Sequence, residues 1–323
     1  MTPAILDLDP TGWLLRETRT GPRPVPEHRL DDHFAAALTP PDWATDLLVY
    51  AHGWQTKPES ALATVHRLLG LITDQYDHGP YPNLKPWRPW TVLIRWPSRS
   101  RPSLGGYRSI RDRAHTMSTQ GHASRVVGRL LGYLNARRID PAAPPVLANR
   151  HGQYLHLIGH SFGCRLLCEA VQWAAGQEPL TLGWSTPKPH GRPFTVDSML
   201  LLQMAAPRDA FASRFTALAE APLRGPVVAT YSQHDRATGF WHLRAEKRAG
   251  IGYAGIGTAP SPVSTVRMLP PRHPYPLTDL DHRFVSVDAS DVFVRGNGPA
   301  GAHSDHLRPE TAHLLLSLAD HSR

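Results

Sequence analysis

The sequence predicts an α/β fold, a doubly wound and mostly parallel β-sheet with helices on both faces. Five short runs are almost wholly apolar, as in parallel strands that are buried on both faces. Helical patterns lie between these runs, and strands that alternate with helices form parallel sheets. The expected strands are residues 46–53, 91–96, 154–160, 198–206 and 226–232.

The expected helices fill the intervals between these strands and follow the last one. Four of them show the apolar spacing of a helix that packs on a sheet. A fifth closes the chain, with a proline at its first position and leucines along its length. They span residues 59–76, 119–138, 163–175, 208–220 and 309–319.

The first residues predict an antiparallel hairpin at an edge of the sheet. Two short apolar runs, AILDL and GWLLRE, flank the tetrad DPTG at residues 9–12. Asp, Pro and Gly at adjacent positions favour a tight turn, so the two runs are expected to pair with each other.

The length and composition predict one domain with insertions. The chain has 323 residues, of which 41% are hydrophobic, enough for one sizeable core. We therefore interpret residues 1–323 as a single domain. Residues 97–118, 177–195 and 237–283 do not fit the alternation of strands and helices. They are either solvated loops or, at 97–118 and 237–283, a lid or pocket walls over a site on the sheet.

The charge and the cysteines exclude several classes of function. The formal net charge is +8, which would suit an anionic partner, but the arginines are scattered and no nucleic-acid motif accompanies them. Specific nucleic-acid binding is therefore not expected. Cys164 and Cys168 lie four residues apart in an expected buried helix and are interpreted as small apolar side chains.

No apolar run approaches the ~20 residues that span a bilayer, and no signal-peptide pattern is present. The expected compartment is the cytoplasm. His156 and His160 lack the carboxylate or cysteine neighbours of a metal site, so neither a metal nor another cofactor is expected.

A serine between two glycines follows the third expected strand. Residues 159–163 read GHSFG, which is the G-x-S-x-G pattern at a strand-to-helix junction. The glycines remove Cβ atoms where strand and helix crowd together, so that Ser161 can project its hydroxyl at the carboxyl end of the sheet. The alternative is a serine that only caps the following helix.

A serine nucleophile needs a histidine base and an acid that orients it. Where the serine lies in such a strand-to-helix turn, called a nucleophile elbow, the chain order is serine, acid, histidine, and the acid follows a late strand. Asp235 meets that condition, with Asp288 or Asp291 as alternatives. For the base we favour His303, which follows a glycine-rich stretch of sequence, over His306, which lies nearer the final helix.

The same chemistry needs two backbone N–H donors for the oxyanion. One is the N–H of Phe162, the residue after the nucleophile. The second is expected from the loop after the first apolar run, where residues 52–54 read HGW and the N–H of Trp54 is the candidate.

The motifs AHGW, WPS, GHSFG, YSQHD and GAHSD together resemble the α/β-hydrolase fold family. Within it they resemble poorly characterised bacterial serine hydrolases of lipase-like type, over residues 46–323. The resemblance implies Ser161 as nucleophile, Asp235 as acid and His303 as base, and hydrolysis of a small-molecule or acyl ester or thioester by acyl transfer.

Two alternatives to this function stay open. One is a non-catalytic binding protein of the same fold. The other is a lipase or phospholipase that docks on an anionic membrane through its arginines. The motifs identify neither the acyl group nor an oligomeric state.

Overall fold

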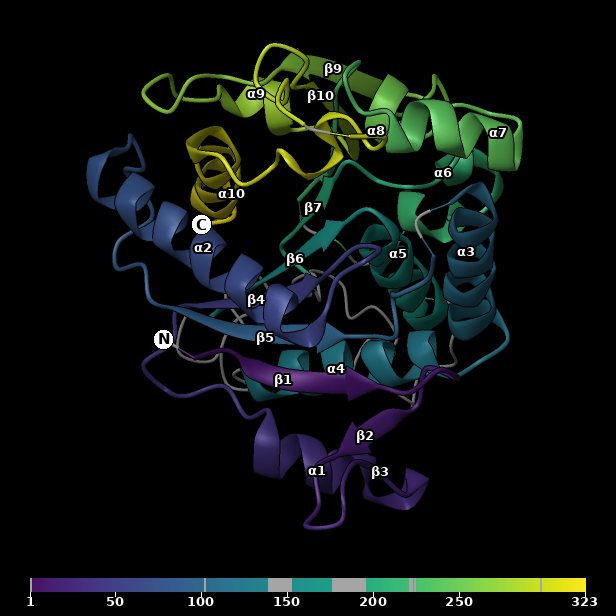
Figure 1. Cartoon of the computed structure of the whole chain (residues 1–323). Coiled ribbons are helices and arrows are strands. Elements are labelled where there is room, and N and C mark those ends of the chain that lie inside the picture. The colour runs from purple at the N-terminus through teal and green to yellow at the C-terminus, as the bar shows by residue number, and fades with distance from the viewer. Residues whose placement is uncertain are drawn as a thin grey trace.

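A computed structural model of the chain describes residues 2–101, 103–138, 153–175, 196–220, 223, 225–296 and 298–323. In these residues ten strands form one sheet, in the order β3-β2-β1-β5-β4-β6-β7-β8-β10-β9 (Figure 1). The strands are β1 (Ala4–Leu8), β2 (Leu14–Arg16), β3 (Arg23–Pro24), β4 (Asp46–Ala51), β5 (Pro89–Arg95), β6 (Tyr154–His160), β7 (Ser198–Leu202), β8 (Val227–Tyr231), β9 (Val263–Arg267) and β10 (Phe284–Asp288).

The strand directions confirm the predicted fold class. β1, β2 and β3 pair antiparallel at one end of the sheet, where the predicted hairpin lies. All other neighbours pair in parallel, including β1 with β5. The five apolar runs expected from the sequence form β4, β5, β6, β7 and β8.

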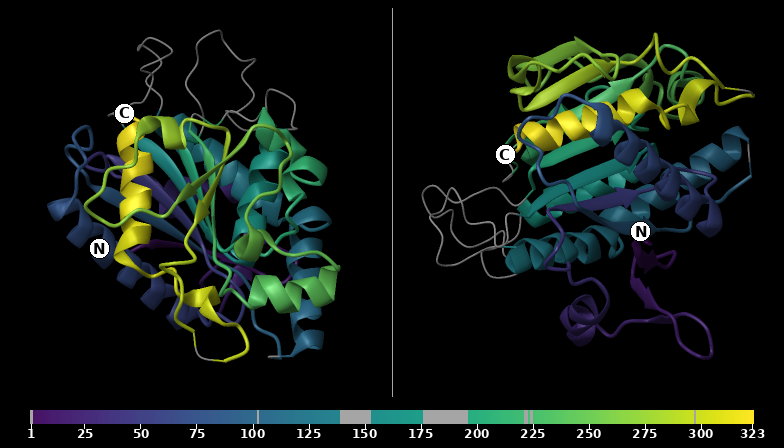
Figure 2. Two further views of the ribbon diagram at one scale, coloured as in Figure 1. Left: turned by 90° about the horizontal axis from the view of Figure 1, so that it is seen from above. Right: turned by 90° about the vertical axis from the view of Figure 1, so that its left-hand side faces the viewer.

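Helices cover both faces of the sheet because the side chains of each strand alternate between two apolar layers. In β4, Leu47 and Val49 contribute to one core, whereas Leu48 and Tyr50 contribute to the other. Figure 2 shows α2 and α10 on one side of the strands and α3 and α5 on the other.

The helices of the described residues match most of the expected positions. They are α1 (Leu30–Ala37), α2 (Pro58–His78), α3 (Leu104–Thr119), α4 (Ala123–Arg138), α5 (Phe162–Ala175), α6 (Ala210–Ser213), α7 (His242–Glu246), α8 (Ile251–Ala254), α9 (Leu277–Leu280) and α10 (Pro309–His321). Single helical turns are η1 (Glu27–Arg29), η4 (Thr216–Ala219) and η6 (Ala302–Ser304), and η5 (Ala237–Trp241) is a π-helical turn.

One expected helix is wrong in detail, and one stretch without an evident pattern forms a helix. The helix expected at 208–220 is broken into α6 and η4, because Arg214 and Phe215 between them leave the helical conformation. Much of the stretch at 97–118, which lacked an evident pattern, forms α3. The Ser103 hydroxyl caps the start of α3 by accepting from the Gly106 N–H. Tyr107 and Ile110 lie on the buried face of the helix.

The insertion at 237–283 contains η5, α7, α8, α9 and the edge strand β9. The strand was not predicted, because its sequence VSTVR has few apolar residues. The positions of these elements do not show whether either insertion acts as a lid or pocket wall, so that role stays a prediction. Residues 177–195 lie outside the described residues.

The sheet order places a topological switch point between β4 and β6. From β4 the chain moves to β5 on one side, and later to β6 on the other side. In open α/β sheets, ligands bind at the carboxyl ends of the two strands that flank such a point. Residues 52–54 follow β4 and Ser161 follows β6, so both predicted halves of the site lie at this edge.

Candidate active site

Ser161 lies in a sharp turn between β6 and α5. Its φ is 55°, a left-handed conformation that a non-glycine residue adopts only when the surroundings hold it there. The Ser161 N–H donates to the Leu202 carbonyl, and its own carbonyl accepts from Ala205 N–H. A Cβ at Gly163 would overlap the Ala51 carbonyl, which explains the second glycine of the motif. These contacts fix the serine at the carboxyl edge of the sheet.

The structure brings Ser161, His303 and Asp235 into one hydrogen-bonded chain. His303 Nε2 lies 2.8 Å from Ser161 Oγ, and His303 Nδ1 lies 2.8 Å from Asp235 Oδ2. Because an ionised carboxylate can only accept, we assign the ring proton to Nδ1, which leaves Nε2 to accept from the serine hydroxyl. All three side chains are buried.

Asp235 is held by further donors besides the imidazole. Thr238 N–H donates to Oδ1 at 3.0 Å, and Gln203 Nε2 donates to Oδ2 at 3.3 Å. The same Gln203 Nε2 donates to the Ala302 carbonyl at 2.9 Å, so Gln203 ties the acid to the loop of the base. Gln203 was not predicted from the sequence. Its signal is a polar residue that directly follows a wholly buried strand.

The loop that carries His303 pairs with the loop that carries Asp235. Ala302 N–H donates to the His234 carbonyl at 2.9 Å, and Arg236 N–H donates to the Ala300 carbonyl at 3.1 Å. Residues 235 and 301 form an antiparallel bridge. The acid and the base are therefore positioned by one shared piece of backbone.

The alternative candidates for the base and the acid are not part of this hydrogen-bonded chain. His306 makes no hydrogen bond with Ser161 in the described part of the chain, and its ring instead packs on that of His160 at 4.0 Å. Asp288 accepts from the Ser290 N–H of its own loop at 2.9 Å, and Asp291 is exposed.

The two candidate oxyanion donors belong to the residue after the serine and to the loop after β4. Within the described residues, no acceptor pairs with the backbone N–H of either Trp54 or Phe162. Trp54 is held by its indole N–H, which donates to Ser100 Oγ at 2.7 Å. A Cβ at Gly53 would lie 2.9 Å from the Ser161 Cβ, so the loop after β4 approaches the nucleophile closely.

Helix α3 packs against both of these residues through one aromatic ring. The Tyr107 ring lies 5.4 Å from that of Trp54 and 5.4 Å from that of Phe162. The Tyr107 hydroxyl is buried and has no partner in the described residues. Of the arginines in the segment 97–118, Arg99 and Arg101 are exposed, and Arg108 donates to the Arg244 carbonyl at 3.3 Å.

Burial keeps the neighbouring imidazoles neutral. Loss of solvation lowers the pKa of His52 to about 4 and that of His306 to about 3. The pKa of His160 is held well below its usual value by burial and then by the nearby His306 and His303 rings. Around the candidate base, these three rings therefore carry no charge at neutral pH.

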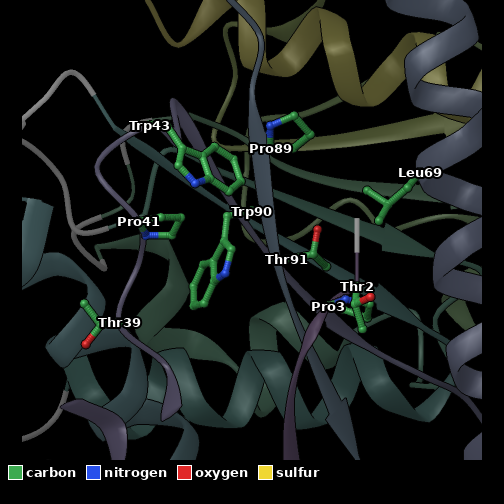
Figure 3. Close-up of a pocket in the computed structure, with 9 residues that line it drawn as sticks. All are labelled: Thr2, Pro3, Thr39, Pro41, Trp43, Leu69, Pro89, Trp90 and Thr91. Carbon is green, nitrogen blue, oxygen red and sulfur yellow. The ribbon is translucent and has the colours of Figure 1, made fainter. Parts of the chain in front are cut away.

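A separate hollow lies at the opposite edge of the sheet. It is lined by Leu69 of α2 and by residues that precede or begin β1, β4 and β5, with Trp43 and Trp90 among them (Figure 3). None of its nine lining residues has a titratable side chain. The three threonines among them carry its only side-chain hydroxyls. The candidate active site is therefore the hydrogen-bonded chain at the carboxyl edge and not this hollow.

Within the described ranges, no group of three or more His, Cys, Asp or Glu side chains is arranged to hold a metal ion. No helix of those ranges combines the length and apolar character needed to cross a membrane.

No protein-family model matches the sequence, and no curated protein does. Among solved structures, the chain is similar to a protein described as a yden-like hydrolase from Pectobacterium atrosepticum, with 15% identity and a TM-score of 0.26 over 68% of this chain and 85% of that one. It is also similar to a metagenomic carboxyl esterase, with 13% identity and a TM-score of 0.33 over 96% of this chain and 82% of that one. Similarity at this level of identity and TM-score does not define a function for this chain.

Proposed function

We propose that the chain is a serine hydrolase that cleaves a carboxylic ester or thioester by acyl transfer. Ser161 is the nucleophile, His303 the general base and acid, and Asp235 the carboxylate that orients His303. The observation that carries this proposal is the chain of hydrogen bonds from Ser161 Oγ through His303 to Asp235, each 2.8 Å long. A serine that merely caps a helix would need no such partners.

In the first half of the reaction, Ser161 Oγ attacks the carbonyl carbon while its proton passes to His303 Nε2. The imidazolium that results is stabilised by the buried Asp235 carboxylate. The carbonyl oxygen becomes an oxyanion, for which the free N–H groups of Trp54 and Phe162 are the proposed donors.

In the second half, the tetrahedral intermediate collapses. The leaving alcohol or thiol takes the proton from His303, and an acyl group remains on Ser161. Water then attacks this acyl-enzyme with His303 as base, which releases the acid and restores the hydroxyl. The reaction as written needs no metal or redox partner, since every proton moves between groups already named.

The experiment is a panel of p-nitrophenyl esters of increasing acyl length, with matched acyl thioesters. We expect the wild type to hydrolyse at least one member of the panel. Ser161→Ala should lose activity by about 10³-fold or more without a change in unfolding temperature, because only one oxygen is removed. Ser109→Ala, at an exposed serine of α3, is the control and should match the wild type.

Two results would contradict the proposal. Full activity in Ser161→Ala would exclude Ser161 as the nucleophile. A wild type without activity on any ester or thioester would favour the non-catalytic alternative. A third result, hydrolysis that requires anionic vesicles, would keep Ser161 as the nucleophile and favour the membrane-docking alternative.

A further inference from the structure

We propose that His160 is a positioning residue that fixes the candidate base against the candidate nucleophile. Its ring N–H holds the backbone of His303 in place, and its own backbone continues directly into Ser161. This inference rests on the proposed function, and it assigns a task to the first variable residue of the G-x-S-x-G motif.

The contact that carries the inference is a hydrogen bond to backbone. His160 Nε2 lies 2.9 Å from the His303 carbonyl oxygen, and since a carbonyl can only accept, the Nε2–H donates. No other donor reaches this carbonyl in the described parts of the chain. The preceding carbonyl, that of Ala302, accepts from Gln203 at 2.9 Å. The two side chains therefore hold the short turn η6 at adjacent peptide groups.

The ring of His160 is enclosed on its other sides. Its face packs on His306, with ring centres 4.0 Å apart and planes inclined by 32°. A Cβ at Gly53 would lie 2.7 Å from His160 Nδ1, so this edge of the ring abuts the loop that carries Trp54. One imidazole thus lies between the loop of the base and the loop of the oxyanion donor.

The contact requires a proton on Nε2 of His160, which either the neutral ring in this tautomer or the imidazolium can supply. Burial and the adjacent imidazoles hold the pKa of His160 low, so it does not compete with His303 for the serine proton. The connection from base to nucleophile is then short: one hydrogen bond, one side chain and one peptide link. A misplacement of about 1 Å at a reacting group can reduce a rate by about 10²-fold.

The test compares side chains that differ in this one donor. His160→Phe keeps a flat ring against His306 but removes the N–H. His160→Gln keeps an amide N–H that can reach the same carbonyl. Steady-state kinetics on an ester that the wild type cleaves should give a kcat lower by about 10- to 100-fold in His160→Phe with KM within twofold, and a kcat within about threefold of wild type in His160→Gln.

A second measurement does not depend on turnover. The proton between His303 Nδ1 and Asp235 should give a downfield NMR resonance in the wild type and in His160→Gln, and the resonance should shift or broaden in His160→Phe. If the wild type cleaves no ester, the proposed function fails, and this resonance still tests the geometry.

Three results would overturn the inference. One is an unchanged kcat and resonance in His160→Phe. Another is an equal loss of kcat in His160→Phe and His160→Gln, which would show that only the imidazole itself is tolerated. Should His160→Phe not fold, His160→Asn takes its place, because its amide is one methylene too short to reach the carbonyl. Activity in His160→Asn equal to that of His160→Gln is the third.

Discussion

At the scale of single residues, the candidate site combines a strained serine with a fully bonded acid. Ser161 is only 2% exposed and has a φ of 55°, so its hydroxyl is held in one direction. Asp235 accepts from a ring N–H, a side-chain amide and a backbone N–H. Both groups are therefore in place before a substrate arrives, which reduces the reorganisation that the reaction requires.

The first prediction concerns the two histidines of the GAHSD segment and its continuation. His303→Ala should lower kcat/KM by about 10³-fold or more, because water does not replace a positioned base at comparable rate. His306→Phe should keep activity within a few-fold, because neither ring nitrogen of His306 has a hydrogen-bond partner to lose in the described residues. Hydrolysis rates of both variants check this, and the reverse order would move the base to His306.

The second prediction concerns Gly53, where the chain passes close to the nucleophile. In Gly53→Ala the new Cβ would lie 2.7 Å from His160 Nδ1 and 2.9 Å from Ser161 Cβ, so the loop has to shift. If Trp54 N–H is an oxyanion donor, kcat should fall by about 10²-fold while KM changes little, because loss of one donor weakens only transition-state binding. A kcat equal to that of the wild type, in a variant with unchanged unfolding temperature, would exclude this loop from the oxyanion site.

At the scale of elements, the central strands were predictable and the insertions were not. Runs such as SMLLL are apolar on both faces, so β7 and its neighbours could be located from the sequence. Helix α3 was missed because LGGYRSIRDRAH combines two glycines with three arginines, which obscure the buried stripe of Tyr107, Ile110, Ala114 and Met117. β9 was missed because an edge strand has a solvent-facing side and needs fewer apolar residues.

The same distinction applies to the candidate site. Ser161, Asp235 and His303 could be proposed because each follows a recognisable strand and has chemistry that needs the other two. Gln203 and the role of His160 could not, since their contacts depend on how two loops far apart in the sequence fold onto one strand end.

The third prediction concerns how α3 contacts the site. Tyr107 packs on Trp54 and Phe162 through its ring, and its buried hydroxyl has no partner within the described residues. Tyr107→Phe should therefore leave kcat/KM within about twofold, and the free energy of unfolding should stay equal or rise by up to about 1 kcal/mol, because an unpaired buried hydroxyl is unfavourable. Tyr107→Ala is the matched control, and it should lower the free energy of unfolding by about 3–5 kcal/mol. A tenfold loss of kcat/KM in a stable Tyr107→Phe would instead place the hydroxyl on the substrate.

At the scale of the whole molecule, the buried histidines make stability depend on pH. Burial lowers the pKa of His52 to about 4 and that of His306 to about 3, against an ordinary value of 6.5. The unfolded chain takes up these protons below pH 6.5 and the folded chain does not. Their contribution to stability is therefore complete above pH 6.5 and is lost as the pH falls towards 3.

The fourth prediction follows from this linkage. Each such histidine should reduce the free energy of unfolding by about 1.4 kcal/mol per pH unit below 6.5, or about 2 kcal/mol at pH 5. Urea unfolding at pH 7.5 and pH 5 measures the change in the wild type. His306→Phe, which cannot titrate, should show a pH dependence smaller by one such contribution. An identical dependence in both proteins would mean that His306 titrates normally in the folded state.

The central claim is that Ser161 is an activated nucleophile, and covalent labelling tests it most directly. The wild type would be treated with a fluorophosphonate, which reacts with the hydroxyl of an activated serine, and the adduct would be located by peptide mass mapping. We predict one adduct per chain, on Ser161, and a greatly slowed reaction in His303→Ala, because the proton of Oγ would have no acceptor. No adduct, or an adduct on another residue of a folded chain, would contradict the account.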